Sequence, residues 1–171
     1  MNFSMPATVA IRRARPEDIA GISELHAHVF GPGRFARSAY RVREGKGHLS
    51  RFCLVAEIGS ELLASLRMTE ITIGGTKGAA LLGPIVVEPE RRGMGLGTKL
   101  VSEGIEAARA AGTALVVLVG DMPYYGRFGF SSVKPGQITM PGPVDPARLL
   151  ALELVPGALA TAIGQVKGYP R

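Results

Sequence analysis

Three glycines on alternate positions, Gly93, Gly95 and Gly97, stand directly before a segment of helical character, and two arginines precede them. Glycine loses more backbone freedom on folding than any other residue, so glycines at a helix entrance suggest that main chain must approach a ligand closely. The N-terminus of a helix presents free N–H groups and the positive end of the helix dipole. The spacing therefore predicts a site for an anionic ligand, such as a phosphate group.

Two familiar nucleotide loops do not fit the spacing of these glycines. A Walker loop requires G-x-x-x-x-G-K-[ST], whereas Gly97 is followed by Thr98 and the lysine arrives one place late. The dinucleotide fingerprint requires G-x-G-x-x-G, which neither Gly93 nor Gly95 begins. A third pattern, [QR]-x-x-G-x-[GA], fits the run Arg92-Gly93-Met94-Gly95-Leu96-Gly97.

The segments around this loop predict a strand, a turn, a helix and a second strand. The run "AALLGPIVVE" is nearly all apolar, as expected for a strand covered on both faces. Pro84 lies inside it and cannot donate to a sheet ladder, so the strand should bulge or part from a neighbour there. A helix with an apolar stripe follows and ends at Gly112, and "ALVVLVGD" is the next buried strand. The crossover connection predicts that the two strands are parallel.

The rest of the chain supplies further elements of a mixed sheet. Alternation along 61–73 predicts a strand with one drier face, paired through Gly59-Ser60 with a strand over 52–58. The sequence also predicts a strand ending near Ala14, helices over about 17–30 and 34–47, and a strand near 149–155. His26 lies at the edge of the apolar face of the first helix and is interpreted as a packing residue. We expect one α/β domain over residues 1–171, with helices on both faces of a mixed sheet.

The glycine run resembles the coenzyme A pyrophosphate loop of the GCN5-related N-acetyltransferase (GNAT) family. The later run Tyr125-Gly126-Arg127-Phe128-Gly129-Phe130 resembles the Y-x-x-x-G-F ending of that family, and "IRRARPEDIAGISELH" resembles its first strand and helix. The C-terminal segment is similar to a bacterial branch of predicted acetyltransferases. The resemblance covers nearly the whole chain and implies a GNAT-like acyl-CoA N-acyltransferase fold. Its coenzyme-binding core spans about 80–131, and a C-terminal strand region spans 132–171.

The resemblance also implies a co-substrate, acetyl-CoA, and a set of site residues without a metal. Tyr125 would face the thioester sulfur and protonate the leaving thiolate, with Tyr124 as a neighbouring competitor disfavoured by the motif spacing. A backbone N–H near Val86 or Val87 could hold the oxyanion of the tetrahedral intermediate. The pantetheine arm would pair with a strand edge and the diphosphate would rest on the amides of the loop. The coenzyme residues so implied are Ile85, Val86, Val87, Arg92, Gly93, Met94, Gly95, Leu96, Gly97 and Thr98.

The acetyl acceptor implied by the family is a primary amine, on a small molecule or on a protein. In the family it is bound by the first helices and loops, here about residues 24–51, and many members are dimers, so a homodimer is compatible with the resemblance. The general base stays open among Glu57, Glu70, Glu88 and Asp121. Two alternatives remain open as well. Tyr125 could be a core aromatic residue, and the domain could be a catalytically silent sensor that binds acyl-CoA.

Composition limits the other classes of function. A net charge of +6 and a pI of about 9.9 favour anionic partners, but an aromatic content of 6% without a base-stacking motif argues against nucleic acid. A single cysteine excludes an internal disulfide, and no apolar run is long enough to span a membrane, so we expect a cytoplasmic protein. One basic cluster reads either as a solvated face or as a patch for an acidic ligand; it comprises Arg34, Arg37, Arg41, Arg43, Lys46 and Arg51.

Overall fold

A computed structural model describes residues 8–32, 42 and 50–169. Their strands form a nine-stranded sheet in which β7 pairs only with β9. The strands are β1 (Ala10–Arg13), β2 (Leu54–Ile58), β3 (Glu61–Ile73), β4 (Thr76–Val87), β5 (Leu115–Val119), β6 (Ser131–Ser132), β7 (Ile138–Thr139), β8 (Leu149–Glu153) and β9 (Gly164–Gly168). The α-helices are α1 (Ile19–Phe30), α3 (Leu96–Ala110), α4 (Met122–Tyr125) and α5 (Ala158–Thr161).

The sheet is mixed, as the sequence predicts. Its main order is β1-β2-β3-β4-β5-β8-β6, and β9 pairs with β3. Each of the first four strands is antiparallel to its neighbour, whereas β4 and β5 are parallel and are connected through α3. A parallel pair needs such a crossover, because a tight turn can join only antiparallel neighbours.

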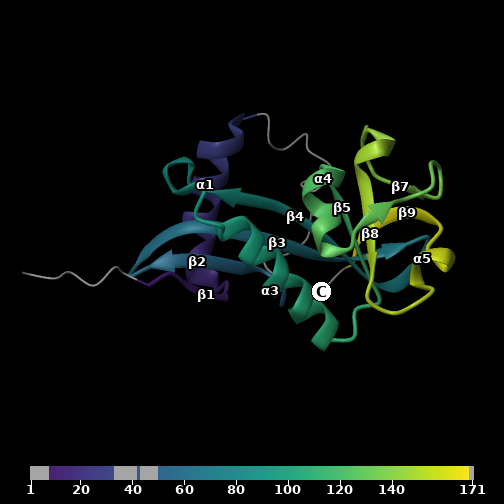
Figure 1. Ribbon diagram of the computed structural model, residues 1–171, viewed down its shortest axis with the longest axis horizontal. Coiled ribbons are helices and arrows are strands. Elements are labelled where there is room, and N and C mark those ends of the chain that lie inside the picture. The colour runs from purple at the N-terminus through teal and green to yellow at the C-terminus, as the bar shows by residue number, and fades with distance from the viewer. Residues whose placement is uncertain (1–7, 33–41, 43–49, 170–171) are drawn as a thin grey trace, which may run out of the picture.

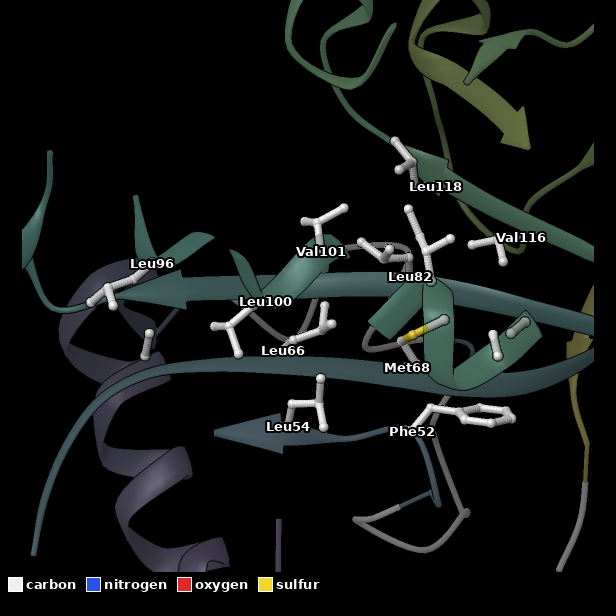
Figure 2. Packing of buried hydrophobic residues seen from close by; sticks show 14 of the residues in the cluster. Phe52, Leu54, Leu66, Met68, Leu82, Leu96, Leu100, Val101, Val116 and Leu118 are labelled. Atoms are coloured by element: carbon white, nitrogen blue, oxygen red, sulfur yellow. The ribbon is translucent and has the colours of Figure 1, made fainter. Parts of the chain in front are cut away.

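Helices α3 and α1 cover opposite faces of the sheet (Figure 1). Figure 2 shows Leu100 and Val101 of α3 beside Leu66 and Leu82, in a cluster to which Leu54 of β2 also belongs. The chain neighbours of Leu54, Cys53 just before β2 and Val55 within it, face the other way and pack with Ile22 of α1. The alternation of strand side chains thus gives β2 one face toward each helix.

Strand β3 corrects one prediction from the sequence. The alternation suggested one drier face, but Ser65, Arg67 and Thr69 are all buried on the face opposite α3. Both faces of β3 are covered, because α3 lies over one and other parts of the chain lie over the second. Polar residues in a strand therefore did not mark a solvent-facing side here.

The other predicted elements have mixed outcomes. The hairpin turns at Gly59-Ser60 and Gly74-Gly75 join β2 to β3 and β3 to β4, and His26 packs edge-on against Phe30 at a centroid distance of 5.8 Å. Strand β9 was not predicted, because Val166 is the only apolar residue among its five. The predicted helix over 34–47, and the basic cluster apart from Arg51, lie outside the described residues. Among those that are described, no helix is long and apolar enough to cross a membrane.

Candidate active site

The turn before α3 contains glycines because its backbone adopts positive φ angles. Gly93 and Gly95 have φ of +88° and +76°, a region that L-residues other than glycine rarely adopt. A Cβ atom added at either would meet no atom of the described residues within 4 Å. Gly97 is already helical, and its Cβ would stand 3.7 Å from the Tyr124 hydroxyl and 3.8 Å from Val87. The turn is therefore not filled by packing from the described parts of the chain.

Among the described residues, the main-chain N–H groups of this turn have no acceptor. The first N–H group of α3 that bonds within the helix is that of Lys99, which donates to the Gly95 carbonyl at 3.0 Å. Across the described residues, the N–H groups from Gly93 to Thr98 have no backbone partner. Arg92 and Met94 are exposed beside them. Free N–H groups and the helix dipole make this turn suitable for an anion.

Strands β4 and β5 part beyond the middle of the sheet. Their parallel pairing runs from Ala79 with Leu115 to Leu81 with Val117, and no later pair joins them among the described residues. Each strand stays paired on its outer side, β4 with β3 as far as Val87 and β5 with β8 as far as Val119. The two inner edges thus face an opening, which we call the split.

Pro84 lies at the start of the split, where the sequence predicts a bulge or a parting. Leu66 pairs with Ile85 and Met68 with Leu82, so one residue of β3 opposes both Gly83 and Pro84 of β4. This is a β-bulge, and Gly83 adopts the positive φ of +121° within it. The prediction for Pro84 is confirmed on both counts.

The inner edge of β4 presents alternate amides to the split. The Glu88 N–H donates to the Leu63 carbonyl on the β3 side at 2.8 Å. Because successive N–H groups of a strand point to opposite edges, those of Ile85 and Val87 face away from β3, and that of Val86 faces β3. The Val86 side chain is also buried, with a fractional exposure of 1%. Ile85 and Val87 are thus the residues whose amides can pair with a ligand in the split.

Tyr125 lies on the other arm of the split, at the end of α4. Its ring packs against Phe128 and Phe130 and lies directly over Gly120, where an added Cβ would be 2.3 Å from the ring. Burial raises the pKa of the Tyr125 phenol to about 12, and the nearby Asp121 carboxylate acts in the same direction. The phenol therefore stays protonated, and available as a donor, across the physiological range.

Tyr124 points to a different place from Tyr125. Its hydroxyl lies 3.0 Å from the Thr98 hydroxyl in the first turn of α3. The two rings meet edge to face at a centroid distance of 4.8 Å. The structure thus directs Tyr124 to the glycine turn, whereas Tyr125 lies over Gly120 at the end of β5.

The four carboxylates considered as a general base each have a basic partner. Glu57 accepts two hydrogen bonds from Arg12, at 2.8 and 3.0 Å, which lower its pKa at the β1 edge of the sheet. Glu70 pairs with Arg51 at 3.0 Å. Glu57 and Glu70 lie on β2 and β3, which do not border the split between β4 and β5.

The two remaining carboxylates lie nearer the split. Glu88 is 3.6 Å from His28, in a cavity between α1 and the end of β4. Asp121 pairs with Arg148 at 3.3 Å, and its carbonyl accepts the Tyr125 N–H at 3.0 Å. Asp121 is thus the one of the four whose charge acts on the Tyr125 phenol.

Three features of the site were not apparent from the sequence. The direction of Tyr124 depends on the approach of α4 to α3, and the role of Gly120 depends on the fold of Tyr125 back onto it. The third feature is a cavity of about 240 Å³ at the mouth of the split. It is lined by Leu81–Pro84 and Val119, and by residues 140–148 of the loop before β8. The glycine in "LVGDMP" is the only sequence signal for any of them, and it reads equally well as a turn.

The fold, with a parted β4–β5 pair and a free helix entrance, is that of an acyl-CoA N-acyltransferase. A family model described as an acetyltransferase (GNAT) domain matches residues 10–133. The chain belongs to the GNAT acetyltransferase family, whose members are acyltransferases that use acetyl-CoA as the acetyl donor. This confirms the resemblance seen in the sequence.

Individual relatives agree with the family assignment. The chain is 30% identical over 116 residues to YjhQ of Escherichia coli, an uncharacterized N-acetyltransferase, in a match that covers 66% of this chain and 64% of YjhQ. A crystal structure of YhbS from Escherichia coli in complex with CoA has a TM-score of 0.82 at 26% identity and covers 99% of this chain and 94% of that one. An acetyltransferase from Brucella melitensis in complex with acetyl-CoA has a TM-score of 0.72 at 30% identity, with coverages of 95% and 97%.

Proposed function

We propose that this protein transfers the acetyl group of acetyl-CoA to a primary amine, on a small molecule or on a protein. The observation that carries the proposal is the combination of the free N–H groups at 93–98 with the split between β4 and β5. One binds an anion and the other offers an open strand edge. Coenzyme A has both a diphosphate and an arm with two amide units, so it matches both features.

The coenzyme is bound mainly by backbone in this proposal. The diphosphate rests on the N–H groups of the turn, and exposed Arg92 lies near its charge. The pantetheine arm pairs with the inner edge of β4 through Ile85 and Val87, while the buried side chain of Val86 supports the strand from the other face. The arm then directs its thioester toward the bulge at Pro84, where the strands begin to part.

The chemical step is a direct attack of the amine nitrogen on the thioester carbon. A C–N bond forms, the carbonyl oxygen becomes an oxyanion, and an N–H group of the open β4 edge stabilises it. The C–S bond then breaks, and the Tyr125 phenol donates its proton to the departing sulfur. The nitrogen loses one proton in the same turnover, which returns the phenolate to its neutral form. The products are the acetylated amine and the free thiol of CoA.

The acceptor approaches from the face of the sheet opposite α3. The cavity at the mouth of the split lies on that face, since its residues Leu81 and Val144 belong to the cluster on the far side from α3. Its volume of about 240 Å³ has room for the reacting end of an amine. Donor and acceptor can therefore meet through the split from opposite faces.

Calorimetry with acetyl-CoA and desulfo-CoA tests the binding half of this proposal, and a thiol-release screen over a panel of amines tests the transfer half. We expect both ligands to bind and at least one class of amine to accelerate thiol release. The absence of heat for both ligands at millimolar concentration would refute the proposal. Binding without transfer to any amine would favour the alternative of a silent acyl-CoA sensor.

A further inference from the structure

The Tyr124 hydroxyl lies in the site but has no role in the proposed acetyl transfer, in which Tyr125 donates the proton. Tyr124 belongs to α4, which follows β5, while Thr98 belongs to α3, which follows β4. Their hydroxyl oxygens are 3.0 Å apart, and this is the one side-chain hydrogen bond between the two arms of the split among the described residues. It lies at the glycine turn, because the Tyr124 hydroxyl is the nearest atom to a Cβ built on Gly97.

The Tyr124 ring is fixed from several sides. The guanidinium of Arg127 lies over it at 4.5 Å from the centroid, and the Arg127 Nε donates to the Tyr124 carbonyl at 3.0 Å. Tyr125 and Phe128 contact its edges at centroid distances of 4.8 and 5.8 Å. The hydroxyl is therefore held in place by contacts that do not involve the hydroxyl itself.

The hydroxyl groups of Tyr124 and Thr98 together carry two O–H donors, and the hydrogen bond between them uses one. The described residues offer no acceptor for the second O–H, whichever oxygen carries it. The spare donor thus lies beside the free N–H groups of the same turn, where an acceptor with negative charge is expected.

We infer that Tyr124 is a coenzyme-binding residue, which acts with Thr98 to donate a hydrogen bond to the diphosphate and to tie the two arms of the split around the coenzyme. This inference rests on the proposed function. It assigns the two adjacent tyrosines different tasks, because Tyr124 acts on the diphosphate and Tyr125 acts on the sulfur.

The test is calorimetric titration of the wild-type protein and of Tyr124→Phe with CoA and desulfo-CoA. Phenylalanine keeps the ring and its contacts, so only the hydroxyl is lost. We expect Kd to rise about tenfold, as for the loss of one hydrogen bond to a charged group. The increase should be the same for both ligands, because the hydroxyl acts away from the sulfur. Tyr169→Phe is the matched control. Tyr169 follows β9, and its ring lies under the ammonium group of Lys77. The Kd of this variant should match that of the wild type.

A second variant separates binding from packing. Thr98→Val should raise Kd as well, and Tyr124→Phe combined with Thr98→Val should be no weaker than the weaker single variant, because the two hydroxyls act as one unit. A Kd for Tyr124→Phe within twofold of the wild type would overturn the inference. So would additive losses in the double variant, or a larger loss for CoA than for desulfo-CoA. A wild-type protein that binds neither ligand refutes the proposed function itself, and this inference with it.

Discussion

The two arms of the split contribute to the site by different means. The arm that follows β4 offers mainly main chain, in the glycine turn and at the open strand edge, together with the Thr98 hydroxyl. The arm that follows β5 offers side chains, because α4 places the phenols of Tyr124 and Tyr125. The first arm needs residues without a Cβ, which are visible in the sequence. The second needs neighbours that only the fold supplies.

The sharpest way to break the main-chain arm is Gly95→Val. Valine is strained at a φ of +76°, and its branched side chain would cover the N–H groups of the turn. If two charge-assisted hydrogen bonds of about 2 kcal/mol each are lost, Kd for CoA rises roughly 10³-fold. Calorimetry measures this loss directly.

Gly112→Val is the matched control for this change. Gly112 ends the same helix with a φ of +83°, and a Cβ there also meets no described residue within 4 Å. Its N–H donates to the Arg109 carbonyl and that of Thr113 to the Ala108 carbonyl, so it closes the C-terminus with a Schellman motif. Both variants should lose similar thermal stability, and only Gly95→Val should lose the coenzyme. Equal losses of affinity would show that strain alone explains the effect.

The side-chain arm is tested by Tyr125→Phe, with a smaller expected effect. Loss of the general acid should lower kcat about 10²-fold, while Kd for CoA stays within twofold, because the phenol acts at the sulfur. Steady-state kinetics with saturating acetyl-CoA separate the two quantities. A rise in Kd with unchanged kcat would reverse the tasks of the two tyrosines.

The pH dependence of kcat tests the protonation state of the Tyr125 phenol. Since the pKa of Tyr125 is raised to about 12, the donor is fully protonated below pH 10 and is lost only as the pH passes through its raised value. Between pH 7 and 10 the rate should therefore show no falling limb from this group. A limb near pH 9 that disappears in Tyr125→Phe would contradict the buried position of the phenol.

The main-chain arm could be predicted from the sequence because its determinants are local. The strand up to Val87, the helix from Leu96 and its end at Gly112 follow from apolar runs and glycines within about 35 residues. The position of the parting followed from Pro84 alone, because proline lacks the N–H that a sheet ladder requires.

The side-chain arm could be predicted only in part, because its determinants are distant. The motif spacing distinguished Tyr125 from Tyr124, but the place of each hydroxyl depends on how α4 packs on β5 and α3. The cavity at the split depends on residues 140–148, which are brought back to Pro84 by the pairing of β8 with β5. Local patterns do not carry that information.

Gly120 gives the smallest expected effect of these tests. It is a glycine on the side-chain arm, and its lack of a Cβ leaves room for the Tyr125 ring. A Cβ there would lie 2.3 Å from the Tyr125 ring and 3.1 Å from Leu118, while the backbone is not in the positive-φ region. The ring cannot move freely, since Phe128 and Phe130 pack against it. In Gly120→Ala the phenol should therefore be displaced, and kcat should fall about tenfold with little change in Kd, since small misplacements near the chemistry are costly.

The control for Gly120→Ala is Gly126→Ala, in the residue after Tyr125, where a Cβ would make an ordinary contact of 3.6 Å with Met122. Its kcat should equal that of the wild type. The decisive measurement is Gly120→Ala combined with Tyr125→Phe. If Gly120 acts only by placing the phenol, kcat of the double variant equals that of Tyr125→Phe alone, because no proton donor is left to misplace. A further fall in the double variant would mean that Gly120 acts through the end of β5, where its N–H bonds to the Arg148 carbonyl at 2.9 Å, and that the two arms differ less than their contacts indicate.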